Sequence, residues 1–238
     1  MRRHVYALLG YAAAAVACRW PLPLHLGTHL TGSPAGDTGV YVWNQWVFQR
    51  ELLDQRRVPY FTDAIFSLTG PANLSLHNYT LFQDLVALPL IRAFGVVAAF
   101  NLVYLLMTIL TGYATFLLAR RVSGGTVESW LAGLLFAWSP IMVTRGGGHF
   151  SLVAAAPLAV FLLLLLRACE RQRVRDAVAL GVTLAWAAAS DAYYAVYCLL
   201  LAAVFLVARV LTLRRRPAPP RAAVRRTLDV LLACAGAL

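Results

Sequence analysis

Runs of about twenty apolar residues, separated by short clusters of arginine, dominate this sequence of 238 residues and restrict what it can fold into. Hydrophobic residues make up 61% of the chain and charged residues 13%. Soluble domains hold roughly 45–50% apolar and about 25% charged residues. A lipid bilayer provides the apolar surroundings that such an excess needs. The composition therefore predicts an integral membrane protein and excludes a disordered chain.

The positions of these runs predict helical spans, because about 20 apolar residues are needed to cross the hydrocarbon core of a bilayer. The predicted spans are residues 5–26, 97–119, 129–144, 151–167, 176–191 and 193–213. A further apolar run, residues 227–238, reaches the last residue of the sequence. Because a stable protein is not expected to end inside a span, we expect this chain to be the N-terminal part of a longer one. The predicted fold is a single all-α, polytopic transmembrane bundle over residues 1–238.

Arginine positions predict the orientation of the spans, because cytoplasmic loops are enriched in basic residues. The clearest cluster lies within residues 214–226. Alternation from there places the N-terminus in the cytoplasm and residues 27–96 outside, provided that the apolar piece 80–94 forms an interfacial or re-entrant helix. A cleaved signal peptide is the alternative for the N-terminus, although the apolar character continues past Arg19. The net charge of 21 − 10 = +11 is thus a sidedness signal, and no nucleic-acid partner is expected.

Asp37, near the start of the long outer segment, is the first candidate site residue. It precedes residues 38–53, which we expect to form a helix on the bilayer surface because aromatic and apolar residues recur there at helical spacing. The apolar positions of this helix are Val40, Trp43, Val47 and Leu53. Asp37 is well placed as the N-cap of the helix. A carboxylate beside a membrane surface is also suited to act as a general base or metal ligand, and both roles can coexist.

A glycine-rich segment, Arg145 to His149, is the second candidate site and lies in a short outer loop. Gly147 and Gly148 allow the backbone to wrap a ligand and present N–H groups to an anion. Arg145 can bind a phosphate as a fork, and His149 can coordinate a metal or exchange a proton. The structural alternative is a tight hairpin in which the glycines only permit the turn and His149 caps a helix.

The second short outer loop carries Asp191, Tyr193 and Tyr194. A carboxylate at a membrane boundary is a functional candidate because burying it is costly. The alternative is that Asp191 is exposed at the interface while the two tyrosines belong to the aromatic belt. The sequence contains no P-loop, no dinucleotide fingerprint and no H-E-x-x-H motif.

Several short motifs in this order resemble those of bacterial multi-pass glycosyltransferases of the GT-C type. The motifs are Gly36-Asp37, Trp43 and Trp46, Leu88-Pro89, Phe94-Gly95, Ser139-Pro140, Gly148-His149, Pro157-Leu158 and Tyr193-Tyr194. The resemblance covers roughly residues 20–200 and rests on the ordered set. The sequence departs from some members of that superfamily in lacking an Asp-x-Asp or Glu-x-Asp pair in the second outer loop.

The resemblance implies transfer of a sugar from a polyprenyl-phosphate carrier to a glycan, lipid or protein acceptor on the outer face of the bacterial inner membrane, as part of cell-envelope assembly. Asp37 would be the general base or would orient the acceptor or a metal. The resemblance leaves open whether the reaction uses a divalent metal ion, Mg²⁺ or Mn²⁺. The candidate ligands of such an ion are His149 and Asp37. The residue types agree with this chemistry, since such a displacement needs a base and positive charge on the leaving phosphate.

Two hypotheses therefore follow from the sequence. The first is a membrane glycosyltransferase that uses a lipid-linked sugar, with Asp37 as the central carboxylate. The second is a non-catalytic polytopic membrane protein, such as a lipid-carrier flippase or an envelope-assembly partner. The predicted spans carry almost no charge, whereas a flippase is expected to line its interior with polar or charged residues. The scarcity of charge favours the enzyme.

Overall fold

The computed structural model describes residues 2–32, 36–68, 70–75, 77–171 and 173–214. Helices account for 76% of the structure and strands for 2%, so the chain is mostly helical, as the sequence predicts. The apolar run 227–238, and with it the predicted incomplete span, lies outside the described residues.

Three helical segments within the described residues are long and apolar enough to cross a membrane. The first is α4 (Val96–Ser123). The second is Thr126–Arg145, which contains α5 (Thr126–Ala137) and α6 (Pro140–Arg145). The third is Ala192–Thr212, within α9 (Ala192–Arg214). These segments correspond to the predicted spans 97–119, 129–144 and 193–213.

The other three predicted spans are helical but short. They are α1 (Arg2–Cys18), α7 (Ala156–Arg171) and α8 (Val174–Ser190), with 17, 16 and 17 residues. Each is below the roughly 20 residues that a full crossing needs. The prediction of six full-length spans is therefore supported for three helices and reduced to short helices for the rest.

Several predicted boundaries are wrong, and local sequence explains each difference. The helix predicted over 5–26 ends at Cys18 because prolines follow, and Leu22–Leu24 forms a 3-10 turn. The helix predicted over 129–144 is interrupted before Pro140, which begins α6 and lacks a backbone N–H. Ser139 caps α6, its hydroxyl oxygen accepting a hydrogen bond from the backbone N of Met142 at 3.4 Å.

The segment 27–96 holds two helices and a small hairpin. Helix α2 (Thr38–Gln49) continues through one π-helical turn, Arg50–Asp54. Strand β1 (Phe61–Thr62) pairs antiparallel with β2 (Ala72–Asn73), and α3 (Leu81–Phe94) has 14 residues. The apolar piece 80–94 is therefore a helix too short to span a membrane, which agrees with the expectation for it.

The predicted helix over residues 38–53 is confirmed, and the face that it buries in the protein combines apolar with polar side chains. Val40 is exposed and Val47 is fully buried. The face that packs on the rest of the protein carries Tyr41, Asn44 and Gln45. Hydrophobic periodicity does not detect the buried polar residues of this face, and the expected position on the bilayer surface stays a prediction.

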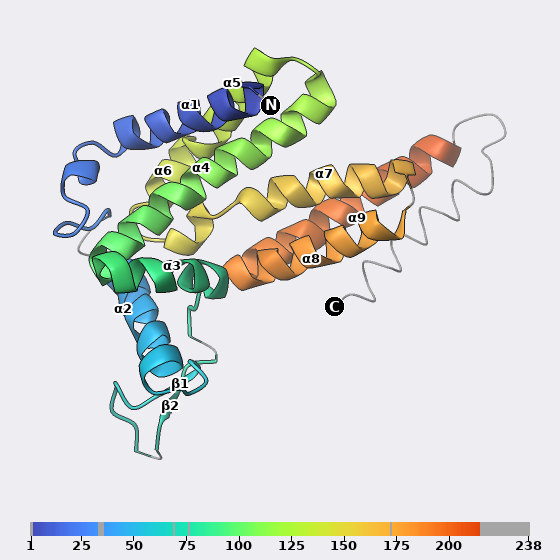
Figure 1. The fold of residues 1–238 in the computed structure, drawn as a ribbon. Helices are drawn as coiled ribbons and strands as arrows, with labels where there is room; N and C mark the ends of the chain where they lie inside the picture. The colour runs from blue at the N-terminus through green and yellow to red at the C-terminus, as the bar shows by residue number, and fades with distance from the viewer. Residues whose placement is uncertain (1, 33–35, 69, 76, 172, 215–238) are drawn as a thin grey trace.

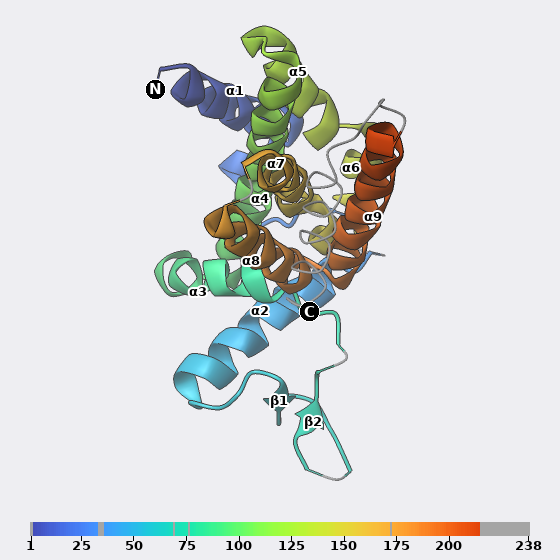
Figure 2. The ribbon, with the colours of Figure 1, turned by 90° about the vertical axis from the view of Figure 1, so that its right-hand side faces the viewer.

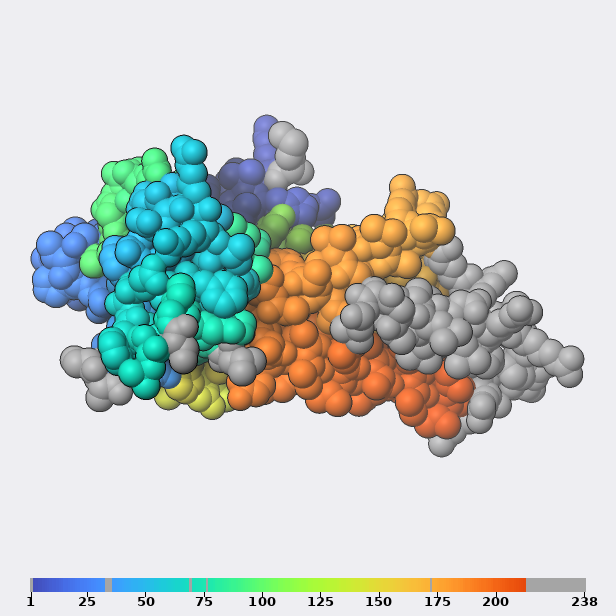
Figure 3. Space-filling view, turned by 90° about the horizontal axis from the view of Figure 1, so that it is seen from below, coloured from blue at the N-terminus to red at the C-terminus, as the bar shows by residue number. Residues whose placement is uncertain are grey.

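Helix α4 is the centre of the structure, because it contacts α1, α3, α5 and α7. Figure 1 shows α1 and α5 beside α4 and shows α7, α8 and α9 extending together to one side, with α2 and the hairpin projecting from the end where α3 lies (Figures 1 and 2). Small residues bring α1, α4 and α5 together: the ring of Tyr11 packs against Gly112 and Gly133, and its hydroxyl donates to the carbonyl of Trp130 at 2.9 Å. In the space-filling view, α2 and the hairpin form a protrusion beside the orange end of α8 (Figure 3).

Candidate functional site

Two loops that are far apart in sequence meet beside the first residue of α2. A methyl group on Gly148 would lie 3.6 Å from the Cα of Gly36 and 3.8 Å from the backbone N of Asp37. Gly32 has a φ of +112°, and a methyl group there would lie 2.8 Å from the carbonyl oxygen of Gly147. Glycine at position 32 permits both the left-handed backbone and this close approach. The 145–149 loop therefore packs directly on the segment that leads to Asp37.

Asp37 and His149 face each other across this contact. The distance from Asp37 Oδ2 to His149 Nδ1 is 3.5 Å, and the two side chains are 54% and 45% exposed. Both groups are thus reachable from solvent, as a reacting pair must be. The sequence predicts these two residues separately, from loops 112 positions apart (149 − 37).

The expectation that the Asp37 side chain caps α2 is wrong. Asp37 occupies the N-cap position, and its backbone oxygen accepts hydrogen bonds from Val40 N and Tyr41 N at 2.9 and 3.2 Å. Its carboxylate makes no capping hydrogen bond. His149 likewise takes the N-cap position of the 3-10 turn Phe150–Val153 without a side-chain capping bond. Neither side chain caps the helix that it precedes, so both are available to each other and to a ligand.

Tyr41, one helical turn after Asp37, connects α2 to the loop that follows His149. Its hydroxyl lies 3.1 Å from the Ser151 hydroxyl and accepts a hydrogen bond from Asn78 Nδ2 at 2.6 Å. Burial raises the pKa of Tyr41; the bonds from Ser151 and Asn78 lower it, and the negative charges of Asp191 and Asp37 raise it further. Both carboxylates therefore lie within electrostatic range of the same buried phenol.

Asp191 is the C-cap residue of α8, and its charge also acts on Tyr41. It joins α8 to α9, is 9% exposed, and its Oδ1 accepts a hydrogen bond from Tyr193 N at 2.7 Å. The alternative of a solvent-exposed Asp191 is therefore wrong. The hydroxyl of Tyr194 donates to the carbonyl of Leu152, which ties α9 to the loop after His149, whereas Tyr193 is exposed.

The glycine loop differs from the expected anion cradle in how its N–H groups are used. The N–H of Gly147 donates to Thr144 O, and that of Gly148 donates to Arg145 O, both at 3.1 Å. These amides are therefore paired within the turn, which disfavours the expected contact with a phosphate. Arg145 itself is exposed at the end of α6.

The candidate metal ligands form a pair rather than a cluster. In the part of the chain that the structure describes, no three His, Cys, Asp or Glu side chains are placed to hold a metal ion together. Asp37 and His149 offer one carboxylate and one imidazole, a donor set that suits Mn²⁺ better than Mg²⁺, because Mg²⁺ prefers oxygen ligands. Water or substrate oxygens would have to complete the coordination of either ion.

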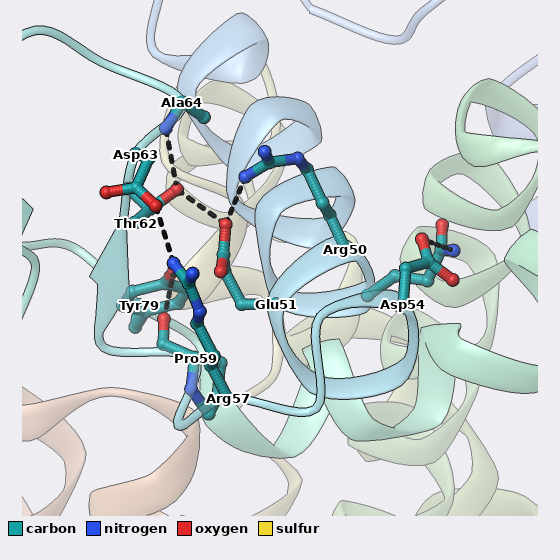
Figure 4. Close-up of polar contacts among 10 residues, drawn as sticks. Arg50, Glu51, Asp54, Arg57, Pro59, Thr62, Asp63, Ala64 and Tyr79 are labelled. Atoms are coloured by element: carbon teal, nitrogen blue, oxygen red, sulfur yellow. Dashed lines mark hydrogen bonds and ion pairs between the residues drawn. The ribbon is translucent and has the colours of Figure 1, made fainter. Parts of the chain in front are cut away.

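A second polar cluster lies at the far end of α2 and fixes the hairpin (Figure 4). Glu51, on the π-helical turn, is fully buried, pairs with Arg50 and accepts a hydrogen bond from Thr62 Oγ1 at 2.8 Å. Arg57 and Asp63 form an exposed ion pair beside it at 2.5 Å. These contacts hold β1 against α2, so we assign the cluster a structural role.

Three residues near the site are not predicted from the sequence: Tyr41, Ser151 and Asn78. Two of them carry a local signal: Tyr41 is one helical turn after Asp37, and Ser151 is two residues after His149. Asn78 lies in a segment rich in turn residues and carries no comparable signal, because only the folding of residues 55–80 back onto α2 brings it to the phenol.

The architecture defines a mostly helical protein, and three helices among its described residues could cross a membrane. A family model described as "Domain of unknown function (DUF6311)" matches residues 85–238, which is more than half of the chain, and the chain belongs to this family. The matched part includes His149 and Asp191, whereas Asp37 precedes it. No curated protein and no solved structure shows significant similarity to the chain.

Proposed function

We propose that this protein is a membrane glycosyltransferase that moves a sugar from a polyprenyl-phosphate carrier to an acceptor on the outer face of a bacterial inner membrane. The supporting observation is the Asp37–His149 pair, 3.5 Å apart and half exposed. In this proposal the helices form a polytopic bundle with a cytoplasmic N-terminus. The loops at 27–37 and 145–149 then lie on the outer side, where lipid-linked sugars are used.

The proposed reaction is a displacement at the anomeric carbon. The acceptor hydroxyl oxygen forms a bond to C1 of the sugar, and the bond between C1 and the phosphate oxygen breaks. Asp37 takes the proton from the hydroxyl, and the electron pair of the broken bond leaves with the polyprenyl phosphate. His149, whose Nδ1 lies 3.5 Å from Asp37 Oδ2, orients the Asp37 carboxylate for this proton transfer.

The test is transfer of labelled sugar from a panel of polyprenyl-phosphate donors, using membranes that contain the full-length protein. Asp37→Asn is expected to lower the transfer rate by about 10²-fold or more, because general base catalysis contributes that much. The matched control is Asp63→Asn, which removes an exposed carboxylate paired with Arg57 and is expected to leave the rate unchanged. Equal rates in Asp37→Asn and wild type would remove Asp37 from the role of base. No transfer from any donor would favour the non-catalytic hypothesis.

A further inference from the structure

A pocket opens between the end of α1 and the segment that leads to α2. Its volume is about 290 Å³, and its lining includes Arg19, His25 and His29. Arg19 Nη2 lies 2.5 Å from the position that a methyl group on Gly146 would occupy. The pocket therefore borders the loop that carries His149.

The pocket is lined by one guanidinium group, that of Arg19, and by the imidazoles of His25 and His29. The guanidinium of Arg19 is held from one side, because Arg19 Nη2 donates to the Tyr104 hydroxyl and Arg19 Cζ lies 4.9 Å from the centre of the Tyr104 ring. The rings of His25 and His29 are 4.7 Å apart, centre to centre. No acidic residue is among the described residues that line the pocket. An arginine with two adjacent imidazoles and no carboxylate is suited to bind an anion.

The turn that carries both histidines is fixed by α4. Asn101 is fully buried, and its Nδ2 donates to the carbonyls of Leu26 and His29, both at 2.7 Å. Backbone hydrogen bonds from Thr28 N and His29 N to the carbonyl of His25 close the same turn at 3.0 Å. The backbone that carries the two imidazoles is therefore held in place by α4.

Apolar side chains surround the cationic groups. Trp20 and Leu30 line the pocket and are 61% and 40% exposed, and Leu24, on the same segment, is 64% exposed. A free, hydrated anion would gain nothing from contact with these exposed apolar side chains. A ligand with a phosphate head and an apolar tail would satisfy both parts of the pocket.

We propose that this pocket, with Arg19, His25 and His29, is a binding site for the phosphate group of a prenyl-type lipid monophosphate. The assignment moves the phosphate contact away from Arg145 and the glycine amides, since the amides are already paired within their turn. It rests on the proposed function in one respect: the phosphate bound here is the one released when the sugar is transferred at Asp37.

Binding is tested with the purified full-length protein in detergent and no sugar, using farnesyl phosphate, farnesol and inorganic phosphate as probes. Calorimetry gives the affinities. Farnesyl phosphate is expected to bind at least about tenfold more tightly than farnesol or inorganic phosphate, because it alone meets both the cations and the rim. Equal affinity for farnesol and farnesyl phosphate, or no binding of farnesyl phosphate, would overturn the proposal.

Variants assign the site. Arg19→Gln and the double variant His25→Gln/His29→Gln are each expected to weaken farnesyl phosphate binding about tenfold or more. Both histidine side chains are exposed, so the double variant keeps the test valid if Arg19→Gln fails to fold. Arg3→Gln, at the other end of α1, is the matched control and is expected to bind like wild type. Wild-type affinity in the double variant would refute the assignment. The binding assay contains no sugar, so its result does not depend on the transfer reaction. Binding of farnesyl phosphate here, together with no activity in the transfer assay, would keep this site and reject the transferase.

Discussion

Asp84 provides a direct thermodynamic test of this fold. It lies in the first turn of α3 and is 1% exposed. Its carboxyl oxygens accept hydrogen bonds from the backbone N and the hydroxyl of Thr80, at 3.2 and 3.3 Å. Burial raises the pKa of Asp84 from 3.8 to about 8, and the bonds from Thr80 offset only part of that effect. At neutral pH the folded protein therefore holds Asp84 mostly as the neutral acid, whereas the unfolded chain holds it as the carboxylate.

The sign of the pH dependence follows from this difference in bound protons. Between the two pKa values the folded state binds one more proton than the unfolded state, so the free energy of unfolding falls as the pH rises. The slope is about 1.4 kcal/mol per pH unit, and it flattens once the pH exceeds the folded-state pKa. From about pH 5 to about pH 8 the expected loss is on the order of 4 kcal/mol, or on the order of 10 °C in Tm.

The perturbation is Asp84→Asn, which replaces the neutral acid with a neutral group of nearly the same shape. Thermal unfolding of the full-length protein in detergent, followed by helical circular dichroism across this pH range, measures the effect. The variant is expected to lose the decrease with pH that Asp84 causes and to be more stable than wild type at the upper end. Asp63→Asn, at an exposed position, is the control and should retain the wild-type slope. The same slope in wild type and Asp84→Asn would refute the reasoning.

Two further substitutions test packing and the hairpin. Gly133→Ala would place a methyl group 2.3 Å from the backbone oxygen of Gly112, so α4 and α5 must separate. Thermal unfolding is expected to show a loss of about 1–3 kcal/mol in the free energy of unfolding. Gly39→Ala, where the methyl group would have no atom within 4 Å, should not destabilise the protein, and equal Tm losses in the two variants would contradict the packing argument. Glu51→Gln removes a buried charge and is expected to cost about 2 kcal/mol and to speed hydrogen exchange in residues 61–73. Unchanged exchange there would show that Glu51 does not hold the hairpin.

The sequence predicted the helices well where an apolar run coincided with ordinary helix signals. The predicted limits of 193–213 and 97–119 are close to α9 and α4. It failed where single residues decide a boundary: Pro140 interrupts a continuous apolar run, and the prolines after Cys18 end α1 early. Run length alone also overestimated the number of full crossings, because apolar residues in turns extend a run without extending a helix.

The candidate site was predictable in its parts and not in its assembly. Residue chemistry selected Asp37 and His149, but their approach depends on contacts between glycines of two distant loops. The capping role expected for the Asp37 carboxylate failed because a local rule cannot include the imidazole that tertiary structure brings to it. The sequence does not predict the cationic pocket, because Arg19 falls inside the apolar run 5–26 and no local pattern links it to His25 and His29.

The attachment of α1 to α4 has a consequence for binding energetics. His4 contacts Tyr113 at 3.1 Å near the start of α1, Tyr11 packs on Gly112 at its middle, and Arg19 lies on Tyr104 just beyond its end. One helix is thus fixed to another along its whole length, with the pocket at one end. A ligand entering this pocket would meet an Arg19 guanidinium whose conformational entropy was lost during folding, so little of the binding free energy would be spent on ordering that group.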